Sequence, residues 1–105
     1  MAKSFDMNQL MRQAQEMQAQ MARAQEQLAN ETVEASAGGG LVTVKATGTG
    51  VVQEIRIDPK VIDPDDPELL EDTVLAAVNE ALRAAQALAE SKLGGSLGGL
   101  GLPGL

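Results

Sequence analysis

The chain has 105 residues, a formal net charge of −7, and no Cys, His, Trp or Tyr. Without Cys there are no disulfides or thiolate metal sites, and without His the commonest acid–base residue and metal ligand is absent, so we expect neither an enzyme nor a cofactor. No run approaches the roughly 18 apolar residues of a membrane span, and the N-terminus lacks the apolar core of a signal peptide. We therefore expect a soluble, unexported protein with no membrane partner and no small-molecule substrate.

The acidic excess is confined to the middle of the chain. Acids and bases cancel within residues 1–29 and within residues 73–105, whereas residues 30–72 hold ten acids against Lys45, Arg56 and Lys60. A net negative charge disfavours nucleic acid, which attracts positive surfaces. Salt screens charges beyond a Debye length of about 8 Å. A polyanion is therefore repelled by the acidic middle segment and tolerated along the two neutral ends.

The first element is a long amphipathic helix. Its apolar residues recur at alternating steps of three and four, which is the pattern of a coiled coil or a long packed helix, and Asp6 is a suitable N-cap. We call this set the Met-rich seam: Met7, Leu10, Ala14, Met17, Met21, Ala24 and Leu28. The flanking positions are mostly glutamine, so charge pairing does not select a partner. The seam is interpreted as core, with a groove for a partner helix as the alternative.

Three short β-rich runs follow, at residues 32–37, 41–47 and 51–57, separated by glycine-rich links. Glycine reaches the positive φ values that tight reversals need, so the pattern predicts an antiparallel meander. Strict alternation places one set of third-run residues on an apolar face: Val51, Gln53, Ile55 and Ile57. It places the others on the opposite face: Val52, Glu54 and Arg56.

Three prolines lie in residues 58–67, and we expect no regular structure there. Asp66 is predicted to cap the second helix, with Pro67 at its first position, where a missing N–H costs nothing. The nearby carboxylates of Asp63 and Asp65, with Asp66, have the chemistry of a hard-cation site or a catalytic pair. The alternative, a capped helix start beside a solvated acidic loop, is favoured because the segment lacks the Gly and the distal Glu of a calcium loop.

The second helix is predicted from Pro67 to about Lys92, with a broad apolar stripe that includes Val78 and Leu82. One small sheet cannot cover this stripe and the Met-rich seam together, so we expect a homodimer whose interface uses the sheet and the adjoining halves of both helices. Residues 1–93 form one predicted helix–sheet–helix domain. Residues 94–105 form a Gly/Leu-rich tail, predicted to be flexible because it cannot offset its ordering entropy, and docking of its leucines on a partner is left open.

Five segments follow one another in a specific order: LMRQAQEMQ at 10–18, AGGGLVTV at 37–44, IRIDP at 55–59, LLED at 69–72 and AAVNEA at 76–81. Taken together, they resemble the YbaB/EbfC family of bacterial nucleoid-associated proteins. This resemblance implies an α+β fold of helix, three-stranded antiparallel meander and helix, assembled as a tweezer-like dimer with long protruding helices. It also implies a cytoplasmic protein that binds duplex DNA in the nucleoid, compacts the chromosome and affects transcription.

Given this resemblance, the candidate DNA-binding residues are the cations outside the acidic middle: Lys3, Arg12, Arg23, Arg83 and Lys92. In the heptad register of the seam, Arg12 falls at f and Arg23 at c, so both lie off the apolar face and can meet phosphates. The alternative is ordinary surface charge, paired with Glu16 and Glu26. Glutamines of the first helix are candidates for base readout or plain surface residues: Gln13, Gln15, Gln18 and Gln20. The alternative function is a protein-interaction adaptor that captures a partner helix on the Met-rich seam.

Overall fold

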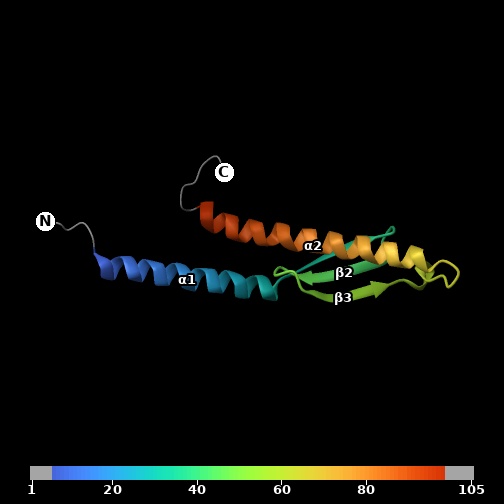
Figure 1. The fold of residues 1–105 in the computed structure, drawn as a ribbon, viewed down its shortest axis with the longest axis horizontal. Helices are drawn as coiled ribbons and strands as arrows, with labels where there is room; N and C mark the ends of the chain where they lie inside the picture. The colour runs from blue at the N-terminus through green and yellow to red at the C-terminus, as the bar shows by residue number, and fades with distance from the viewer. Residues whose placement is uncertain (1–5, 99–105) are drawn as a thin grey trace.

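The computed structural model describes residues 6–98 and shows a helix, a three-stranded antiparallel sheet and a second helix in an elongated molecule of 80 × 27 × 16 Å (Figure 1). The elements are α1 (Met7–Asn30), β1 (Thr32–Ala37), β2 (Val42–Thr47), β3 (Val52–Ile57), the single 3₁₀ turn η1 (Pro59–Val61) and α2 (Pro67–Gly98). The predicted α+β class and the order of its elements are confirmed. Of the candidate DNA-binding residues, Lys3 lies outside the described range.

The sheet is a meander in the order β1-β2-β3, with both neighbouring pairs antiparallel. The β1–β2 turn uses Gly38, Gly39 and Gly40, whose φ angles of 66°, 71° and 93° are strained for residues with a side chain. The glycine links therefore act as predicted.

A bulge changes which residues of β3 share a face. Lys45 is opposite Glu54, but Ala46 is opposite Val52, so β3 holds one extra residue between these pairs. Val52 therefore lies on the same face as buried Ala46 and packs against the core. The strict alternation that placed Val52 with Glu54 was wrong, because a bulge shifts the side-chain period by one residue.

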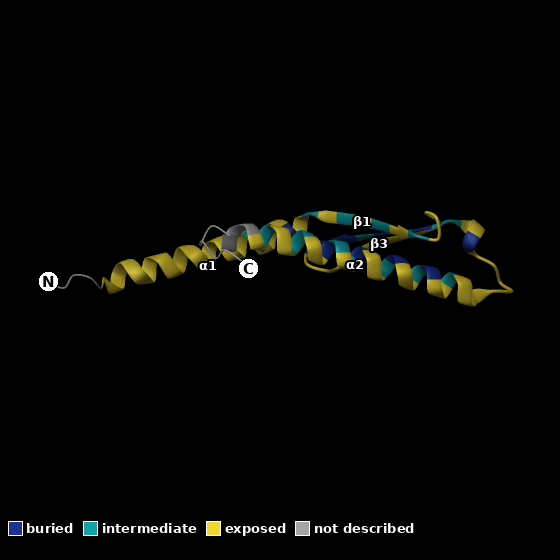
Figure 2. Cartoon of the chain, turned by 90° about the horizontal axis from the view of Figure 1, so that it is seen from above, coloured by how far each residue is buried: buried dark blue, intermediate teal, exposed yellow. Residues whose placement is uncertain are grey.

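The core lies between α2 and the sheet. Fully buried alanines of α2, including Ala77 and Ala81, pack against Val42 and Val44 of β2. Alanine lets the helix backbone approach the sheet closely, and α2 lies mainly over β1 and β2. The corresponding face of β3 remains open, and Ile55 is 44% exposed. Figure 2 shows this contrast between the buried inner stripe of α2 and its exposed outer side.

The segment between β3 and α2 contains a 3₁₀ turn, so the expectation of no regular structure was wrong. Pro59 opens η1, where its fixed φ suits the turn and its missing N–H costs nothing. The Asp58 carboxylate caps the turn by accepting a hydrogen bond from the Lys60 amide at 2.9 Å. The turn places Val61 in the core, where its side chain is 2% exposed.

The start of α2 is as predicted, but its end is not. Pro67 is the first helical residue, and Asp66 Oδ1 accepts a hydrogen bond from the Leu69 amide at 3.2 Å. The helix continues to Gly98, beyond the predicted end near Lys92. Glycine raises the cost of a helix by about 1 kcal/mol per residue without forbidding it. A flexible tail from Gly94 onward stays a prediction, and residues 99–105 lie outside the described part of the chain.

Helix α1 projects from the sheet and is almost entirely exposed (Figure 2). Its N-cap is Asp6, as predicted, with Oδ1 accepting hydrogen bonds from the amides of Asn8 at 3.1 Å and Gln9 at 3.3 Å. Leu28 alone is buried within α1, and Ala24 is half-buried. The α1 helix is therefore attached at its base only. Within residues 6–98, no helix is long and apolar enough to cross a membrane.

Candidate nucleic-acid interface

Two helical segments extend from the same end of the sheet (Figure 1). One is α1, and the other is the C-terminal half of α2, which runs beside the base of α1 in the opposite direction. We call these segments the arms. Four of the predicted DNA-binding residues lie on them, two on each arm: Arg12, Arg23, Arg83 and Lys92.

Arg12 and Arg23 lie on the outward side of α1. At 3.6 residues per turn their separation is about three full turns, so they share one side of the helix, opposite the Met-rich seam, and stand roughly 16 Å apart along its axis. Both are exposed. Two cations in line at this spacing span about half of the 34 Å turn of duplex DNA, which suits contact with separate phosphates.

Neither arginine forms an ion pair with another residue of the described range 6–98. The alternative prediction paired Arg12 with Glu16 and Arg23 with Glu26, but in the described part of the chain no ion pair joins either couple. Glu16 is also exposed and follows Arg12 by about one helical turn on the same side of α1. Glu26 is exposed as well and shares the heptad position of Arg12, so the outward side of α1 carries two cations and two acids.

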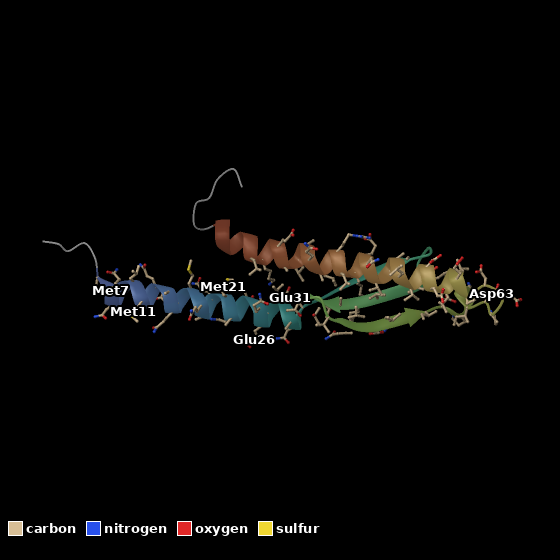
Figure 3. All side chains as sticks on the ribbon, viewed as in Figure 1. Met7, Met11, Met21, Glu26, Glu31 and Asp63 are labelled. Carbon is tan, nitrogen blue, oxygen red and sulfur yellow. The ribbon has the colours of Figure 1, made fainter. Side chains whose placement is uncertain are left out.

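The cations of the second arm are paired with acids. The Nη2 and Nε atoms of Arg83 donate to Glu80 Oε1 at 2.6 and 3.1 Å. Lys92 Nζ lies 2.5 Å from Glu31 Oε2, and Figure 3 shows Glu31 where α1 meets the sheet. Contact of Arg83 or Lys92 with a phosphate must compete with these carboxylates. The two α1 arginines are therefore the better placed cations.

The four candidate glutamines do not share one face. Gln13 and Gln20 flank the Met-rich seam and line a shallow depression with Leu10, Ala14, Glu16 and Met17. Helical periodicity turns Gln15 and Gln18 toward the other flank of the seam. They cannot enter one groove of DNA together, so joint base readout by all four is excluded by the helix geometry.

The acidic loop around Asp63 lies far from the tip of α1. Figure 3 places Asp63 at the opposite end of the molecule from Met7. Here the carboxylates cap backbone amides, with Asp63 Oδ1 accepting from the Asp65 amide at 2.9 Å. This geometry agrees with the capped-helix interpretation. In the described ranges, no three His, Cys, Asp or Glu side chains converge as metal ligands.

The outer face of the sheet carries alternating charges. Lys45 lies between Glu34 and Glu54 in the strand register. Arg56 pairs with Glu54, and this hydrogen bond and charge attraction raise the pKa of Arg56 above its ordinary value. These cations are therefore surrounded by acids and make a poor phosphate-binding surface.

The role of Glu31 was missed by the sequence reasoning. Glu31 and Lys92 are far apart in the sequence, and only the antiparallel arrangement of the arms brings them together. Helical spacing, which reveals pairs three or four residues apart such as Glu80 and Arg83, contains no signal for such a contact.

Comparisons with known proteins agree with this architecture. The model of the YbaB/EbfC DNA-binding family matches residues 2–100. The chain is 54% identical to a nucleoid-associated protein of Ruminiclostridium cellulolyticum, covering 95% of this chain and 88% of that protein. It is 50% identical to a nucleoid-associated protein of Saccharopolyspora erythraea, covering 95% and 94%. The fold is similar to the crystal structure of an uncharacterized protein from Helicobacter pylori, with a TM-score of 0.78, 22% identity, and coverage of 89% of this chain and 98% of that one.

Proposed function

This chain belongs to the YbaB/EbfC DNA-binding family, and from that premise we propose that it binds duplex DNA as a homodimer through its helical arms. In this proposal the dimer resides in the nucleoid, within the cytoplasm, compacts the chromosome and affects transcription. The names of its relatives, which are nucleoid-associated proteins, support the location. Membership in a DNA-binding family also agrees with the prediction that the chain is not an enzyme.

The observation that carries the proposal is the separation of charge along the molecule. Among residues 6–98, Arg12 and Arg23 are exposed on α1 and form no ion pair with a carboxylate, while the acidic loop around Asp63 lies at the other end. A duplex laid against the arms meets cations and stays more than a Debye length of about 8 Å from most of the acids. This arrangement lets an acidic protein bind a polyanion.

The homodimer is supported by the uncovered side of the sheet. Ile55 and Ile57 are 44% and 38% exposed, although they lie on the same face as the buried core of β2. Val78 and Leu82 of α2 are half-buried. A second copy that covers this surface removes apolar area from water, which stabilises the assembly by about 25 cal/mol per Å².

The DNA-binding proposal is tested by fluorescence anisotropy on a random duplex across a salt series from 50 to 200 mM. The double variant Arg12→Ala/Arg23→Ala is expected to keep the fold, weaken binding equally for all sequences and flatten the salt slope by roughly one unit for each lost phosphate contact. The matched control, Lys45→Ala/Lys60→Ala, also removes two cations but from the acidic body. Loss of binding by the control, with retention by the arginine variant, would transfer the binding surface to the sheet.

An adaptor remains the second candidate, and the exposure of the Met-rich seam favours it: Met17 is 51% exposed and Met21 is 47% exposed. A groove of this kind is suited to the apolar face of a partner helix. The adaptor replaces the DNA-binding proposal if no duplex is bound at 50 mM salt while a pull-down returns a protein in stoichiometric amount.

Oligomeric state is tested separately by sedimentation at micromolar concentration. The proposal requires twice the mass of the 10.9 kDa chain. A single-chain mass under these conditions refutes the homodimer, whatever the DNA measurements show.

A further inference from the structure

The Met-rich seam is covered at its base and open toward its tip (Figure 2). Leu28 is 1% exposed, Met21 is 47% exposed and Met7 is 64% exposed. At the base the Gly48 amide donates to the Leu28 carbonyl oxygen at 2.9 Å, so the β2–β3 turn closes the seam there. Within residues 6–98, every position of α1 from Met7 to Met21 is exposed. This part of the seam is therefore an apolar helix face that a second helix can cover.

The sizes of the seam side chains complement the same seam in reverse order. Two copies of α1 can lie antiparallel with Leu10 of each opposite Met21 of the other. In this register the six layers pair, each combination twice, as Met7 with Ala24, Leu10 with Met21 and Ala14 with Met17. Every alanine then meets a long methionine, which fills the layer. In a parallel, in-register pair Ala14 faces Ala14 and Ala24 faces Ala24, and both layers lose packing contacts. The order of side chains thus favours antiparallel pairing.

The depression on α1 has the form of a coiled-coil hole. It is lined by Leu10, Gln13, Ala14, Glu16, Met17 and Gln20. Four of these residues, at heptad positions d, g, a and d from Leu10 to Met17, are the set that receives one side chain of a facing helix in a coiled coil. Ala14 has the smallest side chain of the four and leaves room for the incoming one. In the antiparallel register Met17 of the second copy lies opposite Ala14 and is suited to fill this space.

The charges of α1 permit contact between identical copies. Helix α1 holds two cations and two acids and is neutral overall: Arg12, Arg23, Glu16 and Glu26. The e and g positions beside the seam, which face each other across a coiled coil, carry no charge: Met11, Gln13, Gln18, Gln20, Gln25 and Gln27. Glu16 lines the depression from position c, farther from the seam than g. With helix axes about 8–10 Å apart, the backbones at Glu16 of the two copies are separated by more than a Debye length of about 8 Å. Like charges therefore do not oppose the pairing.

We propose that the Met-rich seam of α1 is an interaction surface for the same seam of a second copy, paired antiparallel with Leu10 opposite Met21. The paired segment runs from Met7 to Ala24 and is about 25 Å long, at 1.5 Å per residue. The covered Leu28 prevents a longer overlap. This arrangement leaves the two sheets at opposite ends of the pair, so two chains that are joined at their sheets cannot also pair in this way. The contact therefore links different homodimers.

Only this last step rests on the proposed function, because it uses the homodimer joined at its sheets. The pairing itself needs α1 alone and does not depend on DNA. Two short helix segments bury less than the about 800 Å² per partner of a standard interface, so free molecules pair weakly. Molecules held side by side, as on one duplex, pair more readily because their effective concentration is high. A paired seam is also closed to the partner helix that an adaptor would capture.

Chemical cross-linking tests the orientation, and the protein has no cysteine of its own. The variants Leu10→Cys and Met21→Cys are mixed at a concentration well above micromolar and treated with a short bismaleimide. Antiparallel pairing should join the two variants to each other several-fold more than either variant to itself, because identical positions lie about 16 Å apart along the pair. The control mixture, Gln9→Cys with Ala22→Cys, has the same alignment but lies off the seam, at exposed positions. Equal linking in the control mixture, or equal self-linking of Leu10→Cys, would overturn the proposal.

Sedimentation at the same high concentration tests the pairing without a cross-link. The wild type is expected to associate beyond the species found at micromolar concentration, whether that species is a homodimer or a single chain. Met17→Glu puts a charge into the layer with Ala14 and should abolish this further association. Ala19→Glu adds the same charge at an exposed position on the outward side of α1 and should behave like the wild type. A failed homodimer changes the starting mass and leaves this comparison intact. No further association of the wild type, or unchanged association of Met17→Glu, would show that the seam does not pair.

Discussion

Val44 and Ile55 are direct partners across β2 and β3 and lie on the same face of the sheet, yet Val44 is 0% exposed and Ile55 is 44% exposed. The difference arises because α2 lies over β1 and β2 and contacts β3 only slightly. Two apolar residues in equivalent positions thus differ in burial. Val44 is covered by α2 of its own chain, and Ile55 is left exposed.

The variant Val44→Asp should therefore prevent folding, whereas Ile55→Asp should prevent only dimer formation. A charge at Val44 has no route to water and is expected to lower the free energy of unfolding by roughly 3–5 kcal/mol, enough to unfold much of the protein. A charge at Ile55 is solvated in a single chain and is excluded only from a dimer interface. Ile55→Asp should give a folded monomer, as measured by circular dichroism and sedimentation. Ser36→Asp, on the exposed outer side of β1, is the control, and a dimeric Ile55→Asp variant would place the interface elsewhere.

The sequence could predict this sheet only in part. Its strands and turns follow from β-branched runs and glycine links, which are local signals. The bulge after Lys45 has no such signal, and it moved Val52 to the covered face. The exposure of Ile55 also could not be predicted, because it depends on where α2 crosses the sheet, which is set by tertiary packing.

Lys92→Ala should weaken DNA binding less than Arg12→Ala. Lys92 already pairs with Glu31 at 2.5 Å, so a phosphate gains little by replacing one anionic partner with another. The pair is partly exposed, with side-chain exposures of 32% and 41%, and its loss should change stability by no more than about 1 kcal/mol. Anisotropy titrations at 50 mM salt compare the two variants. Equal losses of DNA affinity in the two variants would show that DNA readily displaces Glu31 from Lys92.

Gly48→Ala should loosen the base of α1. A Cβ at this position would stand 2.8 Å from Leu28 Cδ2 and 2.9 Å from the Leu28 carbonyl oxygen. The side chain can rotate, but the carbonyl belongs to the helix backbone and cannot move without disturbing it. Overpacking of this kind lowers the free energy of unfolding by about 1–3 kcal/mol. Urea denaturation measures the change, and a wild-type midpoint would mean that the junction adjusts without cost.

Gly94→Ala should instead raise the free energy of unfolding. Nothing lies within 4 Å of a Cβ built at Gly94, and the residue is helical. Alanine should therefore stabilise this part of α2 by up to about 1 kcal/mol through helix propensity alone. Slower amide hydrogen exchange in residues 90–98 is the expected result. Unchanged or faster exchange would contradict the helical assignment beyond Lys92.

For the candidate DNA-binding residues, as for the sheet, the sequence predicts local geometry but not the contacts that form only on folding. The positions of Arg12 and Arg23 opposite the seam follow from helical periodicity, which is fixed by local geometry. Arg83 and Lys92 were indistinguishable from them by sequence position. Their carboxylate partners separate them, and the partner of Lys92 becomes visible only when the chain has folded.

Glu16→Gln should strengthen DNA binding. Glu16 lies on the outward side of α1 between Arg12 and Arg23, so a duplex that meets both arginines also approaches this carboxylate. Removing a like charge near a phosphate in water is worth roughly 0.5–1 kcal/mol, or a few-fold in affinity at low salt, and screening should erase the gain as salt rises.

The matched control for Glu16→Gln is Glu68→Gln, which makes the same change in net charge at the acidic end of the molecule. If the arms hold the DNA, Glu16→Gln binds more tightly than wild type at 50 mM salt and Glu68→Gln does not. Equal gains from both variants would mean that only the total charge matters. In that case the duplex has no fixed position on α1, and Arg12 and Arg23 do not form a defined contact surface.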